Sequence, residues 1–182
     1  VSTVNKLCNL CNHNPAFYRR EYEGINLCKK CFKESVERKV RRTISRWKML
    51  APHDHVAVAV SGGKDSLTLL MILKKLTARF SRTRLTAVTV DEGIAGYREE
   101  AVEIASDYCQ KLGVDHEILS FREVYGYGLD DFLRQKRERM TACSYCGVFR
   151  RKAINLGARR IGASKIATGH NLDDVLQTYL LN

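Results

Sequence analysis

The sequence predicts an α/β fold, a doubly wound parallel sheet, with a small four-cysteine zinc finger at the N-terminus. From residue 55 on, short β-branched runs alternate with longer helix-forming segments, a pattern typical of a parallel sheet with helices on both faces. Two Cys-x-x-Cys pairs lie within the first 31 residues. A chain of 182 residues has room for one full core and a small appendage. We therefore expect a zinc finger with a basic linker helix over residues 1–50 and the α/β domain over residues 51–182.

The zinc finger is predicted from the spacing of its four thiols. Sixteen residues separate the two pairs, and four soft sulfur ligands in so short a segment suit a tetrahedral structural zinc. Free thiols or a redox site are the alternative. The run Phe17–Leu27 predicts a hairpin between the pairs. The expected zinc ligands are Cys8, Cys11, Cys28 and Cys31.

A basic helix follows the second pair. Its apolar positions recur every three or four residues, and Pro52 is expected to end it. These positions are Val36, Val40, Ile44, Trp47 and Leu50.

A phosphate-binding turn follows the first strand of the α/β domain. His55–Val60 predicts a buried strand and Leu67–Leu76 a helix. Glycines at such a turn allow positive φ, so that backbone N–H groups converge on an anion at the helix N-terminus. The turn differs from a Walker motif because its glycines are adjacent and Asp follows the Lys. The expected phosphate-binding residues are Ser61, Gly62, Gly63, Lys64, Asp65 and Ser66.

Three further strands and a crossover helix complete the predicted sheet. Ligands of such sheets bind at the carboxyl ends of the strands. Cys109 falls on the apolar face of the crossover helix and is expected in the core. The strands are Leu85–Val90, Asp115–Leu119 and Ala163–Thr168, and the helix is Glu99–Leu112.

Two other motifs bear reactive groups. Cys143 and Cys146 lie beside a run of arginines, where a redox dithiol and a zinc pair both fit. Asp173 and Asp174 fall near the start of a helix. They either stabilise the helix N-terminus or act on a nucleotide-bound magnesium or on a proton of the reacting base.

The charge of the chain indicates a polyanionic partner. There are 31 Lys and Arg against 20 Asp and Glu, a net charge of +11. Residues 29–48 hold nine basic and two acidic residues, and residues 134–165 hold ten and one. Either block alone fits a solvated helix face, but two blocks beside a phosphate motif favour nucleic acid. No apolar run approaches the roughly 18 residues that span a bilayer, and no leader opens the chain, so we expect a cytoplasmic protein without membrane contact.

The motifs resemble a known family. SGGKDS after a valine-rich strand resembles the PP-loop of the ATP pyrophosphatases. Together with CSYCGVFRR and GHNLDDVLQT it resembles the tRNA 2-thiouridine synthetases, and the doubled CxxC is similar to their TtuA-like, cytosolic uridine thiolase branch. This resemblance implies an ATP-dependent tRNA-uridine 2-sulfurtransferase, which adenylates the C2 oxygen of a uridine before sulfur displaces AMP.

The resemblance also implies cofactors and residue roles. Cys143 and Cys146 match two ligands of a [4Fe-4S] cluster whose third cysteine comes from a later segment. Arg150 matches a phosphate-contacting position, and Asp174 matches the catalytic aspartate. Val90 and Gly169 belong to the nucleotide site. The implied cofactors are ATP, magnesium, zinc and the [4Fe-4S] cluster.

The implied partners are tRNA and a sulfur donor, which is a ubiquitin-like thiocarboxylated carrier or sulfide; a homodimer is the candidate assembly. Wobble and T-loop uridines both remain open as targets. The segment Tyr179–Asn182 ends without a helix cap, so we expect a truncated chain that lacks the third cluster ligand and a second zinc module.

The alternatives are a PP-loop amidating ligase, which needs no CxxC, and a noncatalytic zinc-dependent RNA-binding protein, which leaves SGGKDS unexplained.

Overall fold

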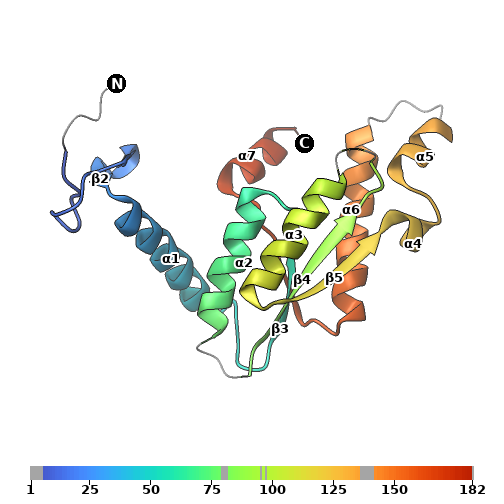
Figure 1. The fold of residues 1–182 in the computed structure, drawn as a ribbon, viewed down its shortest axis with the longest axis horizontal. Coiled ribbons are helices and arrows are strands. Elements are labelled where there is room, and N and C mark those ends of the chain that lie inside the picture. The colour runs from blue at the N-terminus through green and yellow to red at the C-terminus, as the bar shows by residue number, and fades with distance from the viewer. Residues whose placement is uncertain (1–5, 79–81, 95, 97, 136–141, 182) are drawn as a thin grey trace. The chain divides into compact units, whose positions relative to one another are not determined.

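The computed structural model describes residues 6–78, 82–94, 96, 98–135 and 142–181, and it separates into two compact units, Val1–Leu50 and Ala51–Asn182 (Figure 1). In the first unit, the predicted hairpin is formed by the antiparallel strands β1 (Tyr18–Arg20) and β2 (Ile25–Leu27), joined by the 3-10 turn η1 (Glu21–Glu23). The helix α1 (Lys29–Arg46) follows.

The helix α1 ends earlier than its apolar spacing predicted. Lys48 has a positive φ of 48°, and the Met49 N–H donates to the carbonyl of Ile44 at 2.9 Å. This backbone arrangement terminates a helix. The prediction that Pro52 ends it was therefore wrong, since the chain has already turned at Trp47.

The second unit contains one sheet of four parallel strands in the order β5-β4-β3-β6. The predicted strands are confirmed to within two residues at each end. The helices Leu67–Leu76 and Glu99–Leu112 are confirmed, although the first begins three residues earlier and ends one residue later than predicted, and the second begins one residue earlier. The elements are β3 (His55–Ala59), α2 (Lys64–Thr77), β4 (Arg84–Asp91), α3 (Arg98–Leu112), β5 (Asp115–Ser120), α4 (Phe121–Tyr125), α5 (Leu129–Gln135), α6 (Ala142–Arg160), β6 (Lys165–Ala167) and α7 (Leu172–Leu181).

Helices cover both faces of this sheet, as predicted. The helices α2 and α3 pack together against β3, β4 and β5, whereas α6 packs against β4, β5 and β6 from the other side (Figure 1). Cys109 of α3 is 1% exposed, as expected of a core thiol. Among the described residues, no helix is long and apolar enough to cross a bilayer.

The strand order creates a switch point beside β3. The chain runs from β3 outward to β4 and β5 and then returns to the opposite side of β3 for β6. Connections that leave in opposite directions open a crevice at the carboxyl ends of the two strands, where ligands bind in such sheets.

Candidate nucleotide site and cysteine clusters

The segment Ser61–Ser66 forms a tight turn between β3 and α2. Gly62 has a φ of 81°, and a Cβ atom there would overlap the carbonyl oxygen of Ala101, so only glycine fits. The buried hydroxyl of Ser66 donates to the carbonyl of Gly63 at 2.9 Å and accepts from the Ser61 N–H at 3.1 Å. The turn is thereby locked around the N-terminus of α2, where the first backbone N–H groups have no helical acceptor and suit an anion.

A cavity of about 340 Å³ opens beside this turn, a size suited to a small ligand. It brings together predicted site residues that are far apart in the sequence, namely Lys64, Val90, Arg150 and Gly169. Three cationic side chains and one acid face it. The lining consists of Ala59, Val60, Ser61, Gly63, Lys64, Asp65, Ser66, Val88, Val90, Arg98, Arg150, Ile154, Thr168, Gly169 and His170.

The loop from β6 to α7 closes one side of the cavity. A Cβ atom on Gly169 would lie 3.0 Å from the backbone N and Cα of Ser66, so the absence of a side chain allows this loop to approach the phosphate turn. Beyond it, Asn171 and Asp174 form a reciprocal cap of α7. The Asn171 N–H donates to Asp174 Oδ2 at 2.8 Å, and the Asp174 N–H donates to Asn171 Oδ1 at 3.0 Å. The half-buried Asp174 therefore has a structural role, and it does not line the cavity.

A buried carboxylate that carries no recognisable motif lies beside the cavity. Glu92 follows β4, and its side chain is 1% exposed. Its Oε1 accepts from Arg150 Nε at 2.5 Å, while its Oε2 lies 2.5 Å from Arg98 Nε. We call Arg98, Glu92 and Arg150 the arginine–glutamate triad. The sequence signal for Glu92 is weak, because it is only an acid directly after a buried strand.

The triad also reaches the phosphate turn and the inner cysteine pair. Arg98 donates to the carbonyls of Val90 and Ser61, at 2.9 and 3.1 Å. Arg150 Nη2 lies 3.2 Å from the sulfur of Cys146. Burial alone would lower the pKa of Arg150, but the charge of Glu92 and the contact with Cys146 outweigh it and raise this pKa.

The inner cysteine pair lies on α6. Cys146 is 8% exposed and packs with Val90, Phe121 and Ala153. Cys143 belongs to the first turn of the same helix, and its side chain lies outside the described part of the structure.

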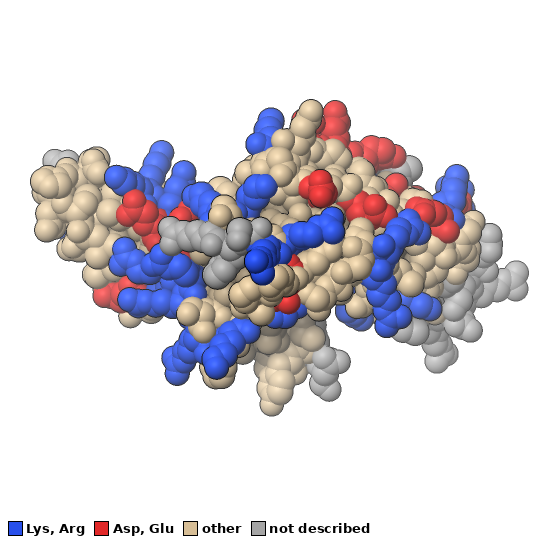
Figure 2. Space-filling view, turned by 90° about the horizontal axis from the view of Figure 1, so that it is seen from below, with Lys and Arg blue, Asp and Glu red and all other residues tan. Residues whose placement is uncertain are grey.

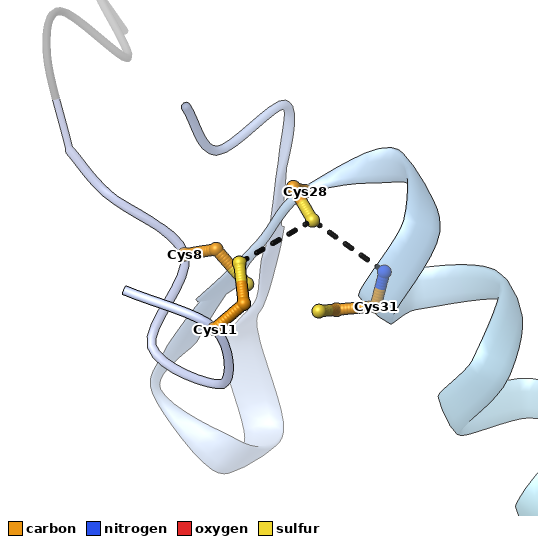
Figure 3. A group of neighbouring side chains, drawn as sticks. All are labelled: Cys8, Cys11, Cys28 and Cys31. Atoms are coloured by element: carbon orange, nitrogen blue, oxygen red, sulfur yellow. Dashed lines mark hydrogen bonds between the residues drawn. The ribbon is translucent and has the colours of Figure 1, made fainter. Parts of the chain in front are cut away.

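The outer four cysteines converge in the first unit, as Figure 3 shows. All four sulfur atoms lie within 4.8 Å of one another, and Cys11 and Cys28 Sγ are 3.9 Å apart. A zinc ion with bonds of about 2.3 Å in a tetrahedron needs sulfur–sulfur distances of about 3.8 Å. Cys28 also caps α1, since its sulfur accepts from the Cys31 N–H. The donor set and its geometry fit a zinc ion.

The four thiols are electrostatically unequal. Burial works to raise the pKa of Cys8, but backbone N–H groups of Cys28, Cys11 and Leu10 outweigh it and lower this pKa to about 6. Burial and the neighbouring thiols raise the pKa of Cys31 to about 12.

The basic blocks lie partly in ion pairs. Figure 2 shows Lys and Arg side chains along the surface that the α1 residues form. Lys39 of this helix contacts Glu23 at 2.8 Å, and Arg160 of α6 contacts Glu123 at 2.8 Å and Glu117 at 3.3 Å. Arg41, Arg42 and Arg46 of α1 line a hollow together with Trp47, which follows the helix. Within the second block, residues 136–141 lie outside the described residues.

Comparison with known proteins gives a family match and close relatives. The model of the PP-loop domain family matches residues 32–182. Cytoplasmic tRNA 2-thiolation protein 1 of Chlamydomonas reinhardtii is 40% identical over 178 residues, which are 97% of this chain and 50% of the relative. The tRNA 2-thiolation protein NcsA of Haloferax volcanii is 40% identical over 182 residues, covering 96% of this chain and 56% of the relative.

A solved structure agrees with these matches. The U34-tRNA thiolase NcsA from Methanococcus maripaludis, determined with its [4Fe-4S] cluster, superposes with a TM-score of 0.87 at 36% identity. The superposition covers 98% of this chain and 58% of that one. The chain thus spans about half the length of the curated relatives it matches.

Proposed function

This chain belongs to the PP-loop domain family, and we propose that it is the ATP-binding part of a tRNA-uridine 2-sulfurtransferase. The observation that supports this most strongly is the position of Arg150. Its guanidinium lines the cavity beside the phosphate turn and lies 3.2 Å from the sulfur of Cys146. A nucleotide site and a sulfur site that share one side chain fit a reaction in which ATP activates a group that sulfur then attacks.

ATP occupies the cavity in this proposal. The pyrophosphate part lies on the Ser61–Ser66 turn, and the adenine lies against Val90. Lys64 and Arg150 balance the charge of the phosphates, because Lys and Arg are the usual partners of phosphate oxygens. Asp65 lines the cavity and supplies a carboxylate oxygen of the kind that magnesium prefers.

The reaction has two displacements. The C2 oxygen of a uridine attacks the α-phosphorus of ATP and releases pyrophosphate, while Asp174 takes the proton that the base loses from N3. Sulfur at the oxidation level of sulfide then adds to C2, the C2–oxygen bond breaks to release AMP, and the proton held by Asp174 returns to N3. Donors fixed beside the phosphates stabilise the charge that develops during the first displacement.

The inner cysteines fit two ligands of an iron–sulfur cluster. Cys146 is buried, and Cys143 belongs to the preceding turn of the same helix. Cys109 is buried in α3, and the other four cysteines form the separate outer set, so a third protein thiolate is absent from the described residues. A [4Fe-4S] cluster, when bound there, supplies an iron that holds the incoming sulfur. The outer set, Cys8, Cys11, Cys28 and Cys31, holds zinc and stabilises the fold of the first unit.

The partners follow from the same proposal. The basic residues of α1 and α6 bind tRNA phosphates, and the sulfur comes from a thiocarboxylated ubiquitin-like carrier or from sulfide. The protein acts in the cytoplasm as a homodimer.

Mass spectrometry of tRNA nucleosides tests this function. A strain that lacks the protein should lose 2-thiouridine at one mapped tRNA position, and the wild-type gene should restore it. A gene with Lys64→Ala should not restore it, since the phosphate turn has lost its cation. Unchanged 2-thiouridine in the deletion strain would refute the proposed function, and restoration by Lys64→Ala would indicate a noncatalytic RNA-binding role.

A further inference from the structure

Glu92 is the most deeply buried charged side chain beside the cavity. Its side chain is 1% exposed, and it lies between two cations that line the cavity, Arg98 and Arg150. Two guanidinium groups that face the same site repel each other unless a carboxylate lies between them. Glu92 supplies that carboxylate and leaves further N–H groups of each arginine for a ligand.

The two arginines depend on Glu92 to different degrees. Arg98 is 8% exposed and donates to two backbone carbonyls, those of Val90 and Ser61. The Nε–H of Arg98 donates to the carbonyl of Val90, so the contact between Arg98 and Glu92 Oε2 is ionic. Within the described structure, no group donates a hydrogen bond to Glu92 Oε2. Arg150 is 46% exposed, and its contacts are with Glu92 and the Cys146 sulfur. Removal of Glu92 should therefore release Arg150 and leave Arg98 in place.

We propose that Glu92 is a positioning residue that fixes Arg150 between the nucleotide phosphates and the sulfur site. The inference rests on the proposed function and adds a residue to it. Arg150 is a long, half-exposed side chain that would otherwise sample several rotamers, and the bond to Glu92 selects the one that faces both sites.

Loss of the negative charge of Glu92 should affect ATP binding differently from loss of a purely structural residue. Glu92→Gln preserves the shape of the side chain but removes a negative charge close to the phosphates. ATP should then bind with a dissociation constant within twofold of the wild-type value, or more tightly. The rate of tRNA-dependent AMP formation should fall at least tenfold, because Arg150 no longer keeps its geometry. A merely structural role would weaken binding and rate together.

The experiments use the intact protein and two readouts. In NMR spectra of the guanidinium groups, Glu92→Gln should shift the Arg150 Nε–H signal toward the position of a solvent-exposed arginine, because a neutral amide oxygen is a weaker acceptor than a carboxylate, while the Arg98 signal changes little. Titration with ATP and the rate of AMP formation give the second readout. Asp91→Asn is the matched control, since it removes the same charge one residue away, and the Asp91 carboxylate contacts the Gly93 N–H; it should leave the rate within twofold.

The outcomes separate this inference from the proposed function. A wild-type protein that forms no AMP with any tRNA overturns both. An active wild type with a Glu92→Gln rate within twofold of it, or with an unmoved Arg150 signal, overturns the role of Glu92 alone. If the single variant does not fold, because two arginines are left without a counter-charge, Glu92→Gln with Arg150→Gln restores the balance. This double variant should be no slower than Arg150→Gln alone, and a further tenfold loss refutes positioning through Arg150.

Discussion

The sulfur of Cys146 lies 3.2 Å from Nη2 of Arg150, one turn further along α6. Arg150 is held from the other side by Glu92, at 2.5 Å. Cys146 can therefore be changed without removing the support of Arg150. This separation allows the sulfur chemistry and the nucleotide binding to be tested independently.

Cys146→Ala should abolish thiolation and leave the dissociation constant for ATP within about threefold of wild type. The reason is that Arg150 keeps its ion pair with Glu92 when the sulfur is lost. Cys109→Ala is the control, since Cys109 is also buried but lies in α3. Nucleoside mass spectrometry and ATP titration measure the two effects. Retained thiolation in Cys146→Ala would contradict the cluster role of this cysteine.

Gly169→Ala should weaken ATP binding about tenfold and cost roughly 1–3 kcal/mol of stability. The new methyl group would meet the backbone of Ser66 at 3.0 Å, and backbone atoms cannot move aside as a flexible side chain can. The loop before α7 must therefore move away from the phosphate turn. Gly147→Ala is the control, because the nearest atom to its Cβ is the end of the Arg151 side chain at 3.8 Å. Equal ATP affinities of the two variants would rule out this close approach as a binding requirement.

Removal of zinc should unfold the first unit and leave ATP binding intact. Cys28→Ala removes one of four thiols that lie within 4.8 Å, together with the cap of α1, and structural zinc contributes about 10–16 kcal/mol to such small folds. Elemental analysis should find one zinc per chain in the wild type and none in Cys28→Ala. Cys109→Ala should retain the zinc. Loss of ATP binding on removal of zinc would contradict the independence of the two units.

The positions of the motifs were predictable because each reflects local chemistry. The valine-rich runs at β3 and β4 specify buried strands, and the parallel arrangement then brings their carboxyl ends, with Ser61 and Val90, to one edge. The spacing of Cys8, Cys11, Cys28 and Cys31 is likewise local. The cavity that unites Lys64 with Gly169 follows from the strand order, whereas the alternation of strands and helices indicated only a doubly wound parallel sheet.

The parts that were not predicted depend on tertiary packing. The helix α6 was expected only as one interpretation of the second basic block, because its most buried side chains, Ala153 and Ala158, are small and give little hydrophobic periodicity. Glu92 and Arg98 belong to no motif, and their pairing with Arg150 joins residues up to 58 positions apart. The cap formed by Asn171 and Asp174 shows that the structural alternative weighed for this aspartate is present.

Replacement of three α1 arginines by neutral residues should reduce the salt dependence of tRNA binding. Arg41, Arg42 and Arg46 line one hollow of this helix, and Arg46 lies 5.6 Å from the ring centroid of Trp47. Each phosphate contact contributes about 0.9 to the slope of log affinity against log salt, so replacing all three arginines by Gln should lower that slope by about 2–3. Lys39→Gln is the control, since Lys39 pairs with Glu23. An unchanged slope in the triple variant would place the tRNA elsewhere.

Asp174→Asn separates the two roles of this residue. The amide oxygen of Asn can still accept the Asn171 N–H that Asp174 Oδ2 accepts at 2.8 Å, so the cap survives. Only the charge in the first turn of α7 is lost, which costs at most about 1 kcal/mol. If Asp174 takes the proton of the uridine, the rate of AMP formation should fall by roughly 10²–10⁴-fold, the usual contribution of a general base.

Asp173→Asn is the matched control, because it removes the same charge from the same turn. Thermal unfolding should place both variants within about 1 kcal/mol of the wild type, and the control should keep its rate. If both variants lose rate, the loss is caused by the missing negative charge at the N-terminus of α7 and not by the loss of a general base. Equal rates in Asp174→Asn and wild type would mean that Asp174 only caps α7 and is not the general base. The general base would then have to come from the cavity lining, where Asp65 is the acidic residue.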